Sequence, residues 1–464
     1  SARAEGEERA REEKGRALRF SGWHRALLSP VQELPRNSTC RGIQIPIGLR
    51  GEDHAEQDLI LRGDTNFCAL VGGMSGSGKS WLFHVIITGG MLRYPPSELQ
   101  MYLVDFKEGV EFRPYAGVTS GHVKVVALHA DREFCLSVLR KLGETRKSRA
   151  EEFHRASAES GRDIHDVTTY RERTGQVMPR ILVIIDEFQN LFSRSDRLAQ
   201  EAESLLNDLI RQGRAFGLHF VLGTQSLRVS GDMHPLSGAL KDQFGTRIAL
   251  RCTEVDSQEF LALGNVQAAT LAKREAIYND GTGATDHNRR FYVFELSEEA
   301  RKAALVRVEQ QHSAAGRRPI VFRGDAPAEL ASAVERWGPE SCTTTSGRDG
   351  GLVLPLGDAV AIGKEAAIRL RRVLGENVLL VGEDEAAARA LSVGIVVFAS
   401  LQRQAEQLGV FMCEAFPHAG SDRDGLRELL SRTPHEATLG SGRQFGKMVT
   451  RLWRELSARE SRPE

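Results

Sequence analysis

The chain has 464 residues, 41% of them hydrophobic, and its 62 basic side chains equal its 62 acidic ones. This length predicts two to three domains. No apolar run approaches the about 18 residues that span a membrane, and no signal peptide opens the chain. Zero net charge argues against a protein coated in nucleic acid, although it leaves room for DNA contact through a few loops.

Cysteine usage points to a reducing compartment. The six cysteines are scattered and form no C-x-x-C pair. This distribution argues against a structural zinc site and agrees with a cytoplasmic protein. The residues are Cys40, Cys68, Cys135, Cys252, Cys342 and Cys413.

Residues 1–39 are predicted to be a charged helical segment and a linker. Residues 1–28 are dense in Glu, Arg and Ala, which indicates a solvated helix or, equally, a disordered charged terminus. Pro30 and Pro35 mark the linker. Because the first residue is not Met, we expect a fragment or a processed chain. Alternating residues 43–49 then predict a strand.

The next stretch predicts a phosphate-binding loop. Residues 67–72 read as a short buried strand, and a helix begins near residue 81. Between them the sequence fits G-x-x-x-x-G-K-[ST], and a strand, a glycine-rich loop and a helix in this order are the context that the pattern requires. Its glycines let backbone N–H groups face phosphate oxygens, Lys79 would reach the β- and γ-phosphates, and the Ser80 hydroxyl would bind Mg²⁺. The nucleotide-binding residues are therefore Gly73, Met74, Ser75, Gly76, Ser77, Gly78, Lys79 and Ser80.

Further strands alternate with helices after this loop. Residues 100–106 predict a buried strand, and Lys107 follows it where side chains of open α/β sheets face the ligand crevice. An ordinary surface turn is the alternative for Lys107. Residues 123–129 predict another strand, and residues 131–173 predict two helices with a break near Gly161.

A second decisive stretch spans residues 181–190. Five apolar residues end in Asp186 and Glu187. With a phosphate loop upstream, Asp186 would hold Mg²⁺ through water, and Glu187 would polarise the water that attacks the γ-phosphate.

The remaining elements complete an α/β sheet. Residues 198–216 predict an amphipathic helix, and residues 218–222 predict a strand followed by Gln225, placed to sense the γ-phosphate. A loop with Arg228 and Lys241 precedes strands at 246–251 and 291–296.

Five of these motifs occur in an order that resembles the FtsK/SpoIIIE motor domain, within the HerA–FtsK ATPases. They are Gly-Met-Ser-Gly-Ser-Gly-Lys-Ser, Val-Asp-Phe-Lys, Ile-Ile-Asp-Glu-Phe, Arg-Ala-Phe-Gly-Leu-His-Phe-Val-Leu-Gly-Thr-Gln and Thr-Arg-Ile-Ala-Leu-Arg. The resemblance covers about residues 40–300, and the motor domain is predicted to span residues 40–311. It implies a RecA-like ATPase that uses ATP and Mg²⁺ and forms a homo-oligomeric ring, usually a hexamer, around double-stranded DNA.

The resemblance also implies residue roles. Arg214, in Arg-Ala-Phe-Gly, would be an arginine finger offered to the nucleotide of a neighbouring subunit, with an ordinary cation near a helix end as the alternative. Gln225 would be the sensor. Lys107, Arg228 and Lys241 are predicted DNA contacts, although this chain has Gln-Ser-Leu-Arg where the family often has Gln-Arg-Pro.

Residues 352–464 are predicted to be a second, degenerate copy after a linker at 312–351. Residues 377–382 echo the strand before the phosphate loop, but Glu383, Asp384 and Glu385 follow where glycines and Lys79 stood. These carboxylates would repel a phosphate. The copy is therefore predicted not to bind ATP, to stop after its first half, and to serve as scaffold or as a docking surface for partner proteins. An unrelated βαβ unit is the alternative.

Three functions stay open at this point. The favoured one is an ATP-driven translocase of double-stranded DNA in chromosome handling, conjugation or defence against foreign DNA, with salt-sensitive phosphate contacts. The second is a protein-moving motor similar to the EccC-type ATPases of type VII secretion, in which degenerate tandem copies are familiar. The third is a nucleotide-gated scaffold with slow hydrolysis.

Overall fold

The computed structural model describes most of residues 37–312, with gaps at 52, 54, 64, 108, 110 and 228–237, then residues 318–324 and, with further gaps, residues 330–460. The predicted helical segment at 1–28 lies outside these residues. The chain divides into two compact units, of which the first extends to Ala326. Among the described helices, none combines the length and apolar character that crossing a bilayer requires.

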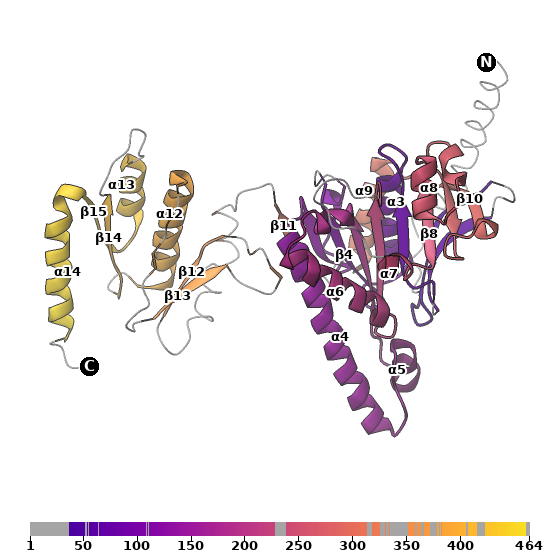
Figure 1. The fold of residues 1–464 in the computed structure, drawn as a ribbon. Coiled ribbons are helices and arrows are strands. Elements are labelled where there is room, and N and C mark those ends of the chain that lie inside the picture. Colours follow the sequence, from indigo (N-terminus) through magenta and orange to yellow (C-terminus); the bar gives the residue numbers. More distant parts are fainter. Residues whose placement is uncertain are drawn as a thin grey trace, which may run out of the picture. The chain divides into compact units, whose positions relative to one another are not determined.

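Eleven of the described strands form one sheet in the first unit (Figure 1). In spatial order they are β11 (Ile320–Arg323), β5 (Val123–Leu128), β4 (Leu99–Asp105), β6 (Arg180–Asp186), β7 (Leu218–Thr224), β3 (Ala69–Gly72), β8 (Thr246–Leu250), β9 (Glu275–Asn279), β10 (Asn288–Val293), β1 (Ile43–Arg50) and β2 (Glu56–Leu61). The strands from β11 to β8 run parallel, and those from β9 to β2 are antiparallel. The carboxyl ends of β3, β4, β6 and β7 therefore share one edge of the sheet.

Both faces of the parallel part are covered, which explains its long apolar runs. Every residue of β6 and β7 is buried. Successive side chains of a strand point to opposite faces. In β3, Ala69 and Val71 accordingly belong to one core and Leu70 to the other.

Helices from different parts of the chain cover the two faces. The first core contains side chains of α3 (Lys79–Arg93) and α9 (Glu298–His312). The second contains side chains of α4 (Arg132–Ser160), α6 (Arg197–Gly213) and α8 (Glu254–Phe260). The predicted α/β sheet flanked by helices is thereby confirmed.

The predicted break in the long helical stretch is also confirmed. Helix α4 ends at Gly161, whose φ of 63° is left-handed and suits glycine. Helix α5 (Val167–Thr174) begins after Asp166, whose carboxylate accepts hydrogen bonds from the N–H groups of Thr168 and Thr169. In Figure 1, α5 lies beside the far end of α4, where Phe153 and Tyr170 share a small core.

Strand β11 lies beyond the motor-domain boundary predicted at residue 311. It pairs in parallel with β5, from Ile320 opposite Val125 to Arg323 opposite Leu128. Residues 320–323 therefore belong to the first sheet and not to the linker. The reason is that β5 would otherwise be an open sheet edge with unpaired backbone groups.

The second unit contains two small sheets. Strands β12 (Leu352–Pro355) and β13 (Ala367–Leu370) pair antiparallel, and β14 (Gly409–Glu414) and β15 (Glu436–Ser441) pair parallel. Its described helices of ten or more residues are α12 (Glu385–Gln402), α13 (Arg423–Arg432) and α14 (Phe445–Glu460).

The strand predicted at residues 377–382 of the second unit is absent from the residues of this range that the structure describes. Val378, Leu379 and Val381 form no strand, and Leu379 and Val381 are 86% and 88% exposed. An apolar run becomes a buried strand only when another layer covers it. Asp384, predicted to repel phosphate, accepts a hydrogen bond of 2.9 Å from the Ala387 N–H and caps α12. A carboxylate thus occupies the helix N-terminus that would favour an anion.

Candidate functional site

The glycine-rich loop joins β3 to α3 at the carboxyl edge of the parallel strands. Gly76 and Gly78 have φ angles of 76° and 113°, which other residues rarely adopt. Met74, Ser75 and Gly76 are exposed, whereas Lys79 is buried as the first residue of α3. The loop therefore presents backbone N–H groups and a helix N-terminus to the solvent at this edge, an arrangement that binds anions.

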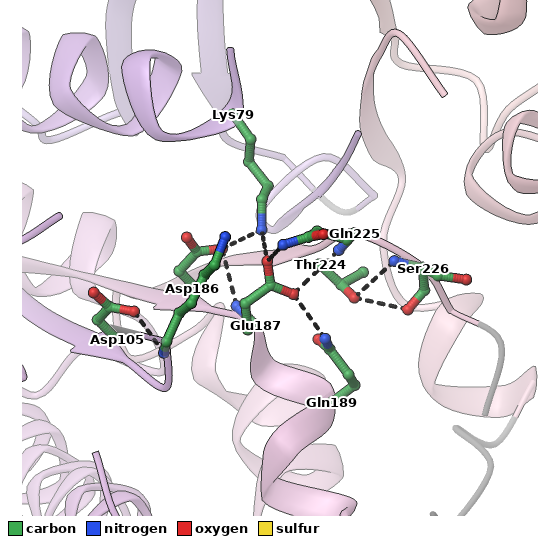
Figure 2. Close-up of polar contacts among 9 residues, drawn as sticks. Lys79, Asp105, Asp186, Glu187, Gln189, Thr224, Gln225 and Ser226 are labelled. Atoms are coloured by element: carbon green, nitrogen blue, oxygen red, sulfur yellow. Dashed lines mark hydrogen bonds and ion pairs between the residues drawn. The ribbon is translucent and has the colours of Figure 1, made fainter. Parts of the chain in front are cut away.

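The Lys79 ammonium lies between two carboxylates. Its Nζ is 2.5 Å from Asp186 Oδ1 and 2.5 Å from Glu187 Oε1 (Figure 2). All three side chains are nearly buried. Asp186 ends β6 and Glu187 follows it directly, so the sheet itself brings both acids to the loop. Charge-assisted hydrogen bonds of this length are the strong ones.

Glu187 has a strained backbone conformation, and both oxygens of its carboxylate accept hydrogen bonds. Its φ of 52° lies in the left-handed region, which costs a residue other than glycine roughly 1–3 kcal/mol. Gln189 Nε2 donates to Oε2 at 2.7 Å, and Gln225 Nε2 donates to Oε1 at 2.8 Å. Burial raises the pKa of Glu187, but Lys79 and these amides outweigh it, so the pKa lies below its usual value.

A third carboxylate lies beside this pair. Asp105 ends β4 directly opposite Asp186 in the register. Its Oδ1 accepts a 2.8 Å hydrogen bond from the Lys107 N–H, and its buried Oδ2 has no hydrogen-bond partner among the described residues. Burial, with Asp186 and Glu111 nearby, raises the pKa of Asp105 to about 6. Asp105 is thus a proton-binding group close to the loop.

Ser80 faces a further acid. Its neighbour Glu111 lies with Oε2 3.6 Å from His84 Nε2. The nearby His84, and to a lesser degree Ser80, lower the pKa of Glu111, whereas burial lowers that of His84. These groups surround the hydroxyl that the loop pattern assigns to Mg²⁺.

Ser80 and Asp186 fit Mg²⁺ that arrives with a nucleotide. A hydroxyl and a carboxylate are ligands that Mg²⁺ accepts when phosphates and waters complete its shell. Within the described residues, no three His, Cys, Asp or Glu side chains are grouped to hold a metal by themselves. The donor set therefore suits an ion shared with phosphates better than a resident one.

Four residues near the loop escaped the sequence reasoning. Asp105 belongs to the Val-Asp-Phe-Lys motif, and Gln189 belongs to the stretch at 181–190. The position of Asp105 at a strand end indicates a side chain that faces the ligand crevice. Glu111 is placed by an irregular loop, for which no local pattern exists. Arg274 has a φ of 66°, donates its N–H to Ser77 O at 3.1 Å and stacks 4.4 Å from the Trp81 ring.

The other predicted site residues lie apart from the loop. Arg214 follows α6, and its carbonyl accepts from Gly217, whose own carbonyl accepts from the Ile181 N–H. Ile181 and Asp186 are five residues apart along β6, about 17 Å at 3.3 Å per residue. The Arg214 backbone is therefore close to the opposite edge of the sheet, beyond reach of its own Lys79.

The predicted DNA contacts have different surroundings. Lys107 is exposed next to the Asp105 carboxylate. Lys241 ends the short helix α7 (Gly238–Lys241), and its Nζ is 3.9 Å from Glu259 Oε2. Arg228 lies outside the described residues.

Residues 45–229 match the model of the FtsK/SpoIIIE family. This part of the chain therefore resembles an FtsK/SpoIIIE-type P-loop ATPase. The match contains the loop, both acids and the glutamine that bonds to Glu187. The predicted family resemblance is thereby confirmed for this part of the chain.

Curated relatives of this FtsK/SpoIIIE domain carry two kinds of name. The ESX secretion system protein EccC of Geobacillus thermodenitrificans is 28% identical over 249 residues, which are 53% of this chain and 16% of that protein. The DNA translocase FtsK of Listeria monocytogenes is 26% identical over 247 residues, 52% of this chain and 31% of that protein. The matched part thus spans less than a third of either relative.

Solved structures show the same fold over both units. The cytoplasmic domain of the Thermomonospora curvata type VII secretion ATPase EccC aligns with a TM-score of 0.61 at 21% identity, over 92% of this chain and 50% of that one. EssC (ATPases 2 and 3) from Geobacillus thermodenitrificans aligns with a TM-score of 0.52 at 15% identity, over 93% and 77%. At these identities the likeness shows the fold alone.

Proposed function

We propose that this chain hydrolyses ATP at residues 73–80 and uses the energy to move a polymer through a ring of copies. The observation that carries the proposal is the Lys79 ammonium, 2.5 Å from both Asp186 and Glu187. A cation that binds phosphate, an acid for Mg²⁺ and a base for water thereby meet in one place. These are the parts that phosphoryl transfer to water requires.

Nucleotide binding would activate Glu187. The Lys79 ammonium has three N–H donors, two of which face Asp186 and Glu187, so phosphate oxygens would compete with these carboxylates for it. When it turns to the phosphates, Glu187 loses the cation that lowers its pKa and becomes the stronger base, while Gln189 and Gln225 keep it in place. Ser80 and Asp186 would hold Mg²⁺, which neutralises phosphate charge when bound.

Arg214 is proposed to act on the nucleotide of a neighbouring copy. An arginine supplied from outside stabilises charge that develops only in the transition state. The position of the Arg214 backbone near the opposite sheet edge supports this role, because the side chain cannot serve its own loop. Hydrolysis would then depend on assembly, with a hexameric ring as the proposed form.

Double-stranded DNA is the first proposed polymer. The relatives named DNA translocase FtsK support it, and Lys107, Arg228 and Lys241 are the proposed contacts. Phosphate contacts of this kind are insensitive to sequence and weaken with salt.

A polypeptide is the second proposed polymer. The specific observation in its favour is that the fold likeness to the EccC cytoplasmic domain covers 92% of this chain and so includes the second unit. Under this proposal the second unit would dock a partner protein.

The test measures ATP turnover of the whole chain with and without linear double-stranded DNA, at two salt concentrations. We expect Glu187→Gln to bind ATP and to lose about 10²- to 10⁴-fold in kcat, the usual contribution of a general base. The exposed Glu172→Gln is the matched control and should turn over like the wild type.

Each outcome separates the proposals. DNA stimulation that fades as salt rises would support the DNA translocase. Turnover that ignores DNA would favour the polypeptide. Bound ATP without turnover in the wild type would contradict the motor and leave a nucleotide-gated scaffold.

A further inference from the structure

A basic cavity lies at the edge of the sheet opposite the nucleotide loop. Its volume is about 230 Å³, and it is lined near the amino ends of the parallel strands by Phe67, Arg180 and His219. Arg41, Arg62 and Arg214 also line it. Drug-sized ligands occupy about 300–1,000 Å³, so this cavity suits a small ion or one end of a larger molecule.

The charge of the cavity is strongly positive. Its lining includes four arginines but one carboxylate, that of Asp166. Asp166 is already bonded to the first turn of α5 and lies 3.3 Å from His165 Nε2. Arg41 and Arg62 are exposed, and neither forms an ion pair with a described residue. Asp166 alone therefore does not balance the charges of Arg41 and Arg62.

The buried wall of the cavity holds a cation with neutral partners. Arg180 is 5% exposed. Its Nε donates to Thr39 O at 2.6 Å, one terminal nitrogen donates to Cys40 O at 2.8 Å, and the other lies 3.2 Å from His219 Nε2. Asp166 and Glu98 act on this charge without a hydrogen bond to it, and a buried charge without a directly bonded counter-ion is costly. An anion in the cavity would lower that cost.

We propose that this cavity is a second phosphate-binding site, in which Arg41 and Arg62 contact the oxyanion and Arg180 supplies buried positive charge. Arginine presents its donors in a planar fork that matches phosphate oxygens. The phosphate has two possible sources: a free phosphate compound, or the nucleotide on the loop of a second copy. The second source rests on the ring proposed above.

The first experiment titrates pyrophosphate calorimetrically into whole-chain Lys79→Ala at constant ionic strength, so that the nucleotide loop contributes little. We expect saturable binding that weakens at least tenfold in Lys79→Ala/Arg41→Gln/Arg62→Gln. The control is Lys79→Ala/Arg173→Gln, because Arg173 is an exposed arginine of α5 outside the cavity lining. The proposal is overturned if pyrophosphate does not bind Lys79→Ala. It is also overturned if pyrophosphate binds Lys79→Ala/Arg41→Gln/Arg62→Gln and the Lys79→Ala/Arg173→Gln control with equal affinity.

The second experiment identifies the source by measuring the ATP turnover of two variants, each alone and mixed. Lys79→Ala keeps the cavity, and Arg41→Gln/Arg62→Gln keeps the loop. If the phosphate belongs to the nucleotide of a second copy, the mixture turns over ATP faster than the sum of its parts. A merely additive rate, together with pyrophosphate binding, assigns the site to a free phosphate compound. Failure of the motor proposal would remove ATP turnover from every sample but leave pyrophosphate binding intact.

Discussion

Glu187 is the side chain whose chemistry depends most on its neighbours. Its carboxylate accepts from Lys79, Gln189 and Gln225 at once. Only the lysine is expected to leave when phosphate binds. The two amides therefore determine where the base points and how acidic it remains during hydrolysis.

Removing one amide should shift the pH dependence of hydrolysis. In Gln225→Ala the carboxylate of Glu187 loses a hydrogen bond that favours its charged form. Its pKa then rises, so the acidic limb of the kcat/KM profile should move to higher pH, by about one unit if the bond contributes about 1.5 kcal/mol. A pH profile of wild type and Gln225→Ala measures this. An unmoved limb with a lower plateau would mean that Gln225 acts on the phosphate and not on Glu187.

Asp105 should limit stability above neutral pH. Its folded-state pKa of about 6 exceeds the ordinary 3.8, so the folded protein binds the proton more tightly than the unfolded one. Stability is then lost as pH rises from about 4 to 6. Asp105→Asn should remove this loss and stabilise the protein at pH 8 by up to about 3 kcal/mol, with little change at pH 4. Denaturant unfolding at both pH values tests it, and a destabilised variant at pH 8 would contradict it.

The connection ahead of β1 depends on a buried ion pair between elements. Glu98, at the start of β4, lies 2.6 Å from Arg171 of α5 and accepts from the N–H and the hydroxyl of Thr39. Burial raises the pKa of Glu98, but Arg171 and Thr39 outweigh it and keep the carboxylate charged. One acid thereby joins three separate segments of the first unit.

Loss of this acid should destabilise the fold without altering the site. Glu98→Ala leaves Arg171 buried without its counter-ion, at a cost of about 3–5 kcal/mol. Glu98→Gln should cost less because an amide oxygen can still accept. The free energies of unfolding of both variants, compared with exposed Glu172→Gln, test the ranking. Equal stability of Glu98→Ala and wild type would show that the pair contributes nothing.

At the scale of the molecule, the sheet separates the nucleotide loop from the Arg214 backbone. The loop follows the carboxyl end of β3, and the Arg214 backbone lies near the amino ends of β6 and β7. If the amino edge of one copy's sheet faces the carboxyl edge of another copy's sheet, Arg214 of the first copy lies at the nucleotide loop of the second. Under the proposed function, this geometry would link ATP turnover to oligomerisation.

Turnover per subunit should therefore rise with protein concentration. Arg214→Ala should lose about 10³-fold or more in kcat, the usual contribution of such an arginine, and should keep ATP binding. Mixing Arg214→Ala with Lys79→Ala should restore activity, because each supplies what the other lacks. Concentration-independent activity, or a mixture without rescue, would contradict action between copies.

The sequence by itself determined the candidate nucleotide site that is proposed for the first unit. Lys79 and Ser80 lie in a local motif, and Asp186, Glu187 and Gln225 follow apolar strands, so short-range patterns placed them at one sheet edge. Buried parallel strands need continuous apolar residues, which is why these strands could be predicted. The motifs at the ends of the strands carried the family resemblance, which the comparisons confirmed.

Only the tertiary structure decided the rest. Strand order placed Asp105 opposite Asp186, an irregular loop brought Glu111 to Ser80, and β11 joined the sheet from beyond the predicted boundary. The arginine cavity gathers residues from 41 to 219. Contacts between residues so far apart depend on which surfaces the packed sheet leaves adjacent, and no local pattern carries that information.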